Sequence, residues 1–163
     1  MPNHVNNFLK IETENPEDVQ RIYPLLSLPS FGFSFEALRP MPDDLRFIHK
    51  GSREIDGKRF TRWYEDPPRG LTDDDVQALR EIYGAADWYE WSIRNWGTKW
   101  DAYDSLLEKG DGWIKVWFNT AWEPPGPWFD ALVDRIRKLD IRADVSLVYS
   151  GEIEEPGVWT KTT

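Results

Sequence analysis

The sequence of 163 residues contains no cysteine, and this absence excludes several kinds of site at once. Disulfide bonds, thiolate metal ligands, a cysteine nucleophile and an iron–sulfur cluster all require that residue. Histidine is almost as scarce, since His4 and His49 are the only two. A Ser-His-Asp arrangement needs a histidine held between a nucleophile and an acid, and no nucleophile-elbow motif accompanies either one. We therefore expect no catalytic residue, although a hydrolase or metal enzyme in which His4 meets a carboxylate stays an open alternative.

Long apolar runs and cofactor motifs are missing as well. No stretch approaches the roughly 18 apolar residues of a membrane span, and residues 1–4 lack the basic and apolar regions of a signal peptide. The carboxylates between residues 101 and 111 lack the order of a calcium loop, and no glycine-rich phosphate loop occurs. We expect no membrane association, no metal, no cofactor and a cytoplasmic location.

Acidic and aromatic residues, in contrast, are abundant. The formal net charge of −9 disfavours non-specific binding to nucleic-acid phosphates and is compatible with a soluble protein or with a basic partner. The chain is 40% apolar and 15% aromatic, which is enough to bury a real core despite its charge. We expect one domain over 1–163.

The spacing of apolar residues predicts an α+β chain. Strands are expected where apolar residues alternate, and helices where they recur every three or four positions, with Pro24 shortening the first helix. The order is β-α-β, an insertion, then β-α-β, which is that of a ferredoxin-like split β-α-β sandwich: an antiparallel sheet with two helices on one face. The expected elements are strands over 5–12, 31–35, 113–120 and 145–149, an added edge strand over 158–161, and helices over 15–26 and 127–139.

The predicted insertion, residues 47–110, is rich in aromatics. A hairpin over 47–64 is indicated by the two-residue turn Asp56-Gly57. A helix over 72–83 begins with a capping box of Thr72 and Asp75, with its buried face on Val76, Leu79 and Tyr83. A Trp-rich helix and turn follows over 87–103.

Residues 88–100 contain four tryptophans and a tyrosine, which is the densest aromatic segment of the chain. On a helix, Glu90 and Arg94 would form a solvent-facing ion pair, and the remaining side chains would cover an arc of about 200°. Five exposed rings would show about 1,000 Å², more than a soluble monomer usually exposes. We expect most rings to be buried, one or two to stay available for contact, and Gly97 to take a positive φ at the helix end.

Four segments carry a family resemblance. They read Pro2-Asn3-His4-Val5-x-Asn7, Phe35-Glu36-x-Leu38-x-Pro40-Met41-Pro42-Asp43-Asp44-Leu45, Asp87-Trp88-Tyr89 followed by Asn95-Trp96-Gly97-Thr98-Lys99-Trp100-Asp101-Ala102-Tyr103, and Phe118-x-Thr120-Ala121-Trp122-x-Pro124-Pro125. Together they resemble the YubB-like, ferredoxin-like domain proteins of phages, prophages and conjugative plasmids. The resemblance implies that fold and a mobile-element setting in the cytoplasm of a bacterial host cell. It implies no activity.

Two functional hypotheses follow. The first is a non-enzymatic accessory protein that binds and inhibits a host protein, for example a defence nuclease or CRISPR effector, with acidic side chains that mimic DNA phosphates. The second is a nucleic-acid-binding module that uses the basic hairpin 50–62, whose cations alternate with aromatic rings. The candidate partner-binding residues are Trp96, Lys99, Trp100, Trp63, Arg59 and Arg62.

Overall fold

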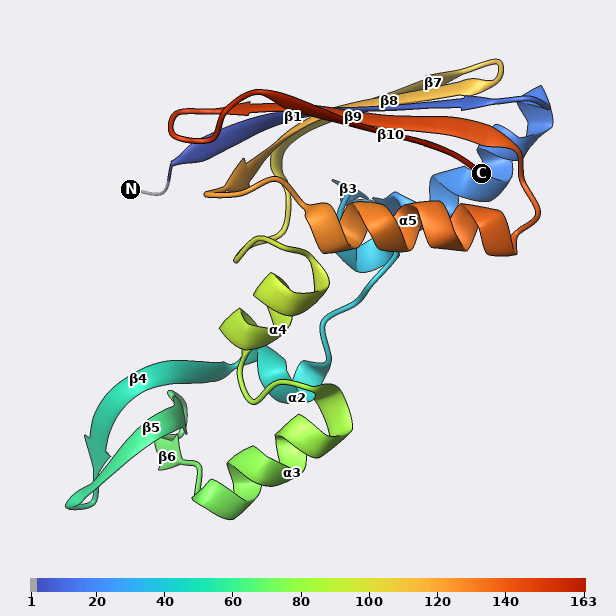
Figure 1. Cartoon of the computed structure of the whole chain (residues 1–163). Helices are drawn as coiled ribbons and strands as arrows, with labels where there is room; N and C mark the ends of the chain where they lie inside the picture. Colours follow the sequence, from blue (N-terminus) through green and yellow to red (C-terminus); the bar gives the residue numbers. More distant parts are fainter. Residues whose placement is uncertain (1–2) are drawn as a thin grey trace. The chain divides into compact units, whose positions relative to one another are not determined.

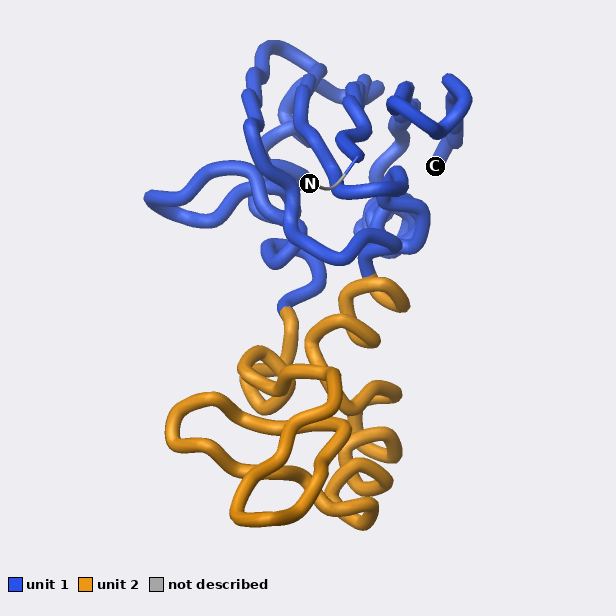
Figure 2. Tube along the Cα trace, turned by 90° about the vertical axis from the view of Figure 1, so that its left-hand side faces the viewer, with its two compact units in different colours: residues 1–40, 96–163 blue, residues 41–95 orange. Residues whose placement is uncertain are grey.

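The computed structural model describes residues 3–163, which are drawn in Figure 1 and divide into two compact units coloured in Figure 2. The described part of unit 1 is residues 3–40 and 96–163, and unit 2 is Met41–Asn95. Met1 and Pro2, which begin the first of the four quoted segments, lie outside the described residues. The expectation of a single domain with an insertion over 47–110 stays a prediction beside this division.

Unit 1 is built on a five-stranded antiparallel sheet, which confirms a mixed α+β chain with an antiparallel sheet. The strand order is β10-β9-β1-β8-β7. Side chains alternate between two faces of each strand, and Val5, Leu9 and Ile11 are buried on one face as predicted. The strands are β1 His4–Thr13, β7 Tyr103–Gly110, β8 Trp113–Ala121, β9 Ala143–Gly151 and β10 Gly157–Thr162.

Strand β7 was not among the predicted elements. Its pairing with β8 is irregular between Tyr103 and Leu106, where Asp104 has a positive φ of 50°. This bulge breaks the alternation of apolar and polar residues on which a strand prediction depends. Three charged side chains along the strand hide it further, as is common for a sheet edge.

The helices of unit 1 lie on one face of its sheet (Figure 1). Helix α5, Gly126–Lys138, buries Trp128, Leu132, Val133 and Ile136, as its spacing predicts. The helix expected over 15–26 is three short consecutive turns, with Pro24 in the last of them, so the expected shortening is confirmed. These turns are η1 Pro16–Asp18, α1 Val19–Ile22 and η2 Tyr23–Leu25.

The strand expected over 31–35 is wrong in extent. Only Gly32–Phe33 forms a strand, β3, and it pairs with β2, Ser27–Leu28, in a two-stranded sheet that is separate from the five-stranded one. Phe35 instead begins a 3-10 turn, η3 Phe35–Ala37, because the Ser34 hydroxyl accepts a hydrogen bond from the Glu36 N–H and caps that turn. Phe33 and Phe35 nevertheless meet in the core, with ring centroids 5.9 Å apart.

Unit 2 contains the predicted hairpin and the predicted capped helix. Thr72 and Asp75 form the capping box, and Gly84 ends the helix with a φ of 73°. Its inward residues Val76, Leu79 and Tyr83 are only half-buried, which corrects their expected burial. The elements are α2 Asp43–Arg46, β4 Ile48–Ile55, β5 Lys58–Tyr64, β6 Arg69–Gly70, α3 Asp73–Tyr83 and α4 Trp88–Asn95. Within residues 3–163, no helix is long and apolar enough to cross a membrane.

Candidate binding surface

The Trp-rich segment divides into buried and exposed rings. Trp91 and Trp96 are buried, Trp88 is half-buried, and Tyr89 and Trp100 are 41% and 42% exposed. This agrees with the prediction that most rings are internal and that one or two remain available. The expected Glu90–Arg94 ion pair is wrong, because Glu90 binds two other arginines.

The buried part of the segment anchors the chain in unit 1. The Trp96 indole N–H donates to the Arg39 carbonyl at 3.0 Å. Gly97 has a φ of 88°, and a Cβ there would lie 2.5 Å from Pro127 Cδ. The Thr98 hydroxyl donates to the Ala121 carbonyl at 2.8 Å. Glycine is required at 97 both by the left-handed backbone and by the close approach of the proline.

Asp101 completes this anchor. Its carboxylate accepts from the Ser34 hydroxyl at 2.5 Å and from the backbone N–H groups of Phe35 at 2.8 Å and Ala102 at 2.7 Å. Burial raises the pKa of Asp101 and outweighs these hydrogen bonds, which act to lower it. Trp96, Gly97, Thr98 and Asp101 therefore hold this segment in unit 1. Between them, Lys99 is half-buried and Trp100 is exposed.

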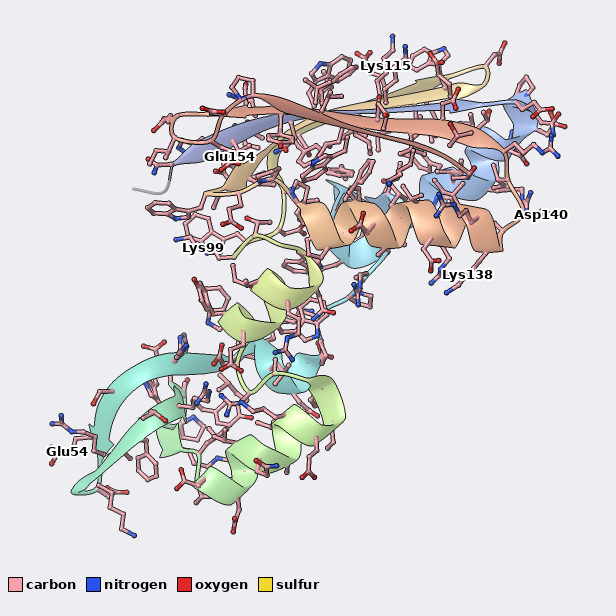
Figure 3. The ribbon with its side chains drawn as sticks, viewed as in Figure 1. Glu54, Lys99, Lys115, Lys138, Asp140 and Glu154 are labelled. Atoms are coloured by element: carbon pink, nitrogen blue, oxygen red, sulfur yellow. The ribbon has the colours of Figure 1, made fainter. Side chains whose placement is uncertain are left out.

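Lys99 and Trp100 belong to a cluster that we name the aromatic corner: His4, Lys99, Trp100, Tyr103 and Trp122. The Lys99 ammonium lies 4.3 Å from the Trp100 ring centroid and 5.9 Å from that of Trp122. The rings of Trp100 and Tyr103 are 6.5 Å apart, and the Tyr103 hydroxyl lies 2.5 Å from His4 Nδ1. Figure 3 labels Lys99 at the end of unit 1 away from Asp140. The corner thus joins two exposed tryptophans through one cation.

Trp122 has an unusual backbone for a large residue. Its φ is 74°, and a bulky side chain at positive φ costs about 1–3 kcal/mol. The strain is held by a hydrogen bond from its N–H to the Asn3 carbonyl at 2.8 Å, and by one from the Thr120 hydroxyl to the Glu123 carbonyl at 2.7 Å. The side chain is 49% exposed. A strained residue that presents a large ring to solvent is not explained by stability alone.

The three hairpin candidates lie in unit 2, and the structure does not bring them together. Arg62 is buried, with its Nε 2.9 Å from Asp87 and its Nη2 2.5 Å from Glu90. Trp63 stacks on His49, while Arg59 is exposed. Arg62 is therefore engaged inside the unit, and only Arg59 keeps its charge at the surface.

The carboxylates that hold Arg62 form a small network with Arg80. Glu90 Oε1 accepts from Arg62 and, at 2.9 Å, from Arg80. Burial would raise the pKa of Glu90, but hydrogen bonds from Arg80 and the Ala86 N–H and the charges of both arginines hold it at about 2. Arg94, the partner expected for Glu90, instead donates to the Gly84 carbonyl.

Sequence reasoning found Lys99 and Trp100 but not Trp122, His4 or Tyr103 as parts of one surface. The strained Trp122 lies in the quoted segment before Pro124-Pro125, yet nothing local indicates a positive φ, which is usually a position of glycine or asparagine. Within residues 3–163, no three histidine, aspartate or glutamate side chains gather as a metal site would require. No protein-family model, curated protein or solved structure matches the chain.

Proposed function

We propose that this chain is a binding protein of a phage or other mobile element and that it docks on a host protein through the aromatic corner. The observation that carries the proposal is Trp122, which is held exposed at a strained φ of 74°. Tryptophan is enriched among residues that dominate binding energy at protein interfaces. Lys99, lying over Trp100, limits the motion of that ring and so lowers the entropy lost on binding.

We further propose that unit 1 has the ferredoxin-like arrangement. Along the chain its main elements run β1, α1, β7, β8, α5 and β9, and within the sheet the strands lie in the order β9-β1-β8-β7. That is the chain order of a split β-α-β sandwich, in which every neighbouring pair is antiparallel. Strand β10 is a fifth strand, which pairs with β9 at one edge of the sheet. The arrangement supports a fold assignment and by itself says nothing of function.

The partner that best fits this surface is a basic host protein, such as a defence nuclease or a CRISPR effector. A formal charge of −9 attracts proteins that bind nucleic acid, because complementary charge accelerates encounter. The corner supplies the contact of high affinity, and the acidic remainder supplies the long-range attraction. Inhibition then results from occupation of the surface that the effector uses for nucleic acid.

The test is capture from a lysate of the bacterium in which the element resides, with the full chain as bait. We expect one protein to be retained by the wild type and by Ile82→Ala, an exposed control in unit 2, and to be lost with Trp100→Ala and Trp122→Ala. A phage-plating assay on cells that carry the captured system then measures inhibition. Retention that is unchanged in both tryptophan variants would exclude the corner, and no specific retention would exclude the proposal.

Nucleic-acid binding by the hairpin is the second candidate. The observation in its favour is that the Arg53 guanidinium lies 4.3 Å from the Trp63 ring while Lys58 and Arg59 are exposed beside it. Titration of labelled single-stranded DNA and RNA at low salt would test it with Lys58→Glu and Arg59→Glu. Arg62 is unsuitable for this purpose, because its replacement would break a buried ion pair. Binding that both variants leave unchanged would exclude the hairpin.

A further inference from the structure

The face of the unit 1 sheet turned away from α5 carries a continuous row of apolar side chains. Phe8 pairs with Trp117 on one side and with Val148 on the other. Leu106 lies opposite Trp117, and Val158 lies opposite Val148, so the row crosses all five strands. Leu106, Val148 and Val158 are 55%, 46% and 59% exposed. We call these five residues the apolar row.

The row is flanked by polar residues on both sides. Figure 3 shows Lys115 projecting from this face and Lys138 from α5 on the opposite side of the sheet. On the three central strands, the next residues on the same face lie two positions from the row. On one side of the row these residues are neutral, and on the other side they include two lysines. The neutral flank is Asn6, Asn119 and Ser150, and the basic flank is Lys10, Lys115 and Ser146.

We propose that two copies of this chain associate face to face through the apolar row, with their two-fold axis along the row. Neighbouring strands are about 4.8 Å apart, so the row is about 19 Å long. Each of its five members is uncharged, and a row that meets itself across a two-fold axis satisfies the self-complementarity of a symmetric dimer. Two sheets packed in this way lie about 10 Å apart with interdigitating side chains.

Charge on β1 selects this axis. Phe8 is the centre of a symmetric series, since Asn6 and Lys10 lie two residues away and His4 and Glu12 lie four away. Rotation about the row places Lys10 against the Asn6 of the other copy. It also places Glu12 against the His4 of the other copy. An axis along the strand would instead oppose lysine to lysine and glutamate to glutamate, which is unfavourable.

A single strand of nucleic acid fits the face less well. Lys10 and Lys115 are offset there by Glu12, Glu108 and Asp144, so the face has no surplus of positive charge. Lys10 is already 2.7 Å from Glu12. The rings of Phe8 and Trp117, 5.0 Å apart, would stack bases, but the aliphatic residues on the outer strands would not.

The size of the face predicts a weak dimer. From His4 to Glu12 the strand rises about 26 Å, which with the row length gives roughly 500 Å² for each copy. Stable interfaces bury about 800 Å² from each partner. Association should therefore depend on concentration, with monomer at low micromolar protein and dimer at higher concentration.

Sedimentation velocity of the full chain across that range is the test. We expect concentration-dependent dimerisation by the wild type and by Ile153→Lys, an exposed control in the β9–β10 loop, and monomer only with Trp117→Lys. Glu12→Lys should weaken the dimer at least about tenfold, and the added change His4→Glu should restore it. Circular dichroism confirms that each variant is folded.

Each other result overturns the proposal. A wild type that stays monomeric at hundreds of micromolar, or a dimer that survives Trp117→Lys, would exclude the row as the interface. Failure of His4→Glu to restore the Glu12→Lys variant would exclude this axis. A monomer whose binding of single-stranded RNA or DNA is lost with Phe8→Ala would make the face a nucleic-acid site. Both surfaces include His4, but Trp100 and Trp122 lie outside the apolar row. Trp100→Ala and Trp122→Ala should therefore leave the dimer intact, so a failure of this inference can be distinguished from a failure of the proposed host-protein docking.

Discussion

The two units of this chain are stabilised by different interactions. Unit 1 has an aromatic and aliphatic core in which Phe33, Phe118 and Trp128 are in mutual ring contact. Unit 2 places an ionic network at its centre, with Arg62 between Asp87 and Glu90. Within the described residues, helix α3 of unit 2 contains no buried residue. A small unit buries little apolar surface. Unit 2 does bury Leu45, Ile48 and Trp91, and the charged hydrogen bonds add to this apolar core in fixing the packing of hairpin and helix.

The strongest test of this contrast removes the centre of unit 2. Arg62→Ala leaves Asp87, which has no exposed surface, without its counter-ion. Loss of one partner of a buried pair costs about 3–5 kcal/mol. We expect amide hydrogen exchange to show lost protection throughout Met41–Asn95, with the sheet of unit 1 still protected. Arg59→Ala is the surface control and should change stability by less than about 0.5 kcal/mol.

Loss of protection in both units together would show that they fold as one cooperative body. The complementary variant replaces Arg62, Asp87 and Glu90 by Met, Leu and Leu. Apolar replacement of a whole buried network is often neutral or stabilising. A triple variant as stable as the wild type, beside an unfolded single variant, would show that the network specifies the packing more than it stabilises it.

The next test acts on the anchor in unit 1. Gly97→Ala places a Cβ 2.5 Å from Pro127 Cδ at a φ of 88°. Overpacking and left-handed strain together predict a loss of about 2–4 kcal/mol. Chemical denaturation followed by tryptophan fluorescence measures it. Gly57→Ala, at a φ of 77° with no neighbour within 4 Å, carries strain without the clash and is the matched control. Equal losses in the two variants would exclude the contact with Pro127 as a cause.

A third variant separates stability from binding. Trp122→Gly removes the strain of a large residue in a left-handed backbone, which stabilises the fold by about 1–2 kcal/mol. It also removes the packing of a half-exposed ring, which destabilises the fold. We expect a free energy of unfolding that is unchanged or about 1 kcal/mol higher, together with loss of the captured host protein. Such a trade between stability and function is typical of strained sites. A variant clearly less stable than the wild type would make Trp122 a structural residue.

In both units, the sequence predicts those structural features that depend on the local spacing of residues. The faces of β1, β8 and α5, the hairpin turn at Asp56-Gly57 and the capping box of α3 follow from residues a few positions apart. What the sequence misses depends on distant partners. Glu90, on helix α4, was expected to bind Arg94, four residues on, but it binds Arg62 of strand β5 and Arg80 of helix α3. The exposed corner was predicted at Lys99 and Trp100 only, because the backbone that presents Trp122 depends on a hydrogen bond to the distant Asn3 carbonyl as well as on its own neighbours.

The smallest expected effect concerns acid. The pKa of Glu90 is about 2 in the folded chain against an ordinary value of 4.5, so its contribution to stability is present above pH 4.5 and is lost as the pH falls toward 2. Asp101 has the opposite sign: burial raises its pKa above 3.8, so its contribution is full below pH 3.8 and is lost as the pH rises through the raised value. Acid therefore lowers the stability of unit 2 through Glu90, while it removes the cost of a buried charge on Asp101 in unit 1.

Because Glu90 is partly solvated, the effect on stability is modest. Denaturation midpoints of wild type and Glu90→Gln between pH 6 and 2.5 measure it, and the difference between the two should shrink as the pH falls. A constant difference would mean that Glu90 is not ionised in the network, and the ionic account of unit 2 would fail with it.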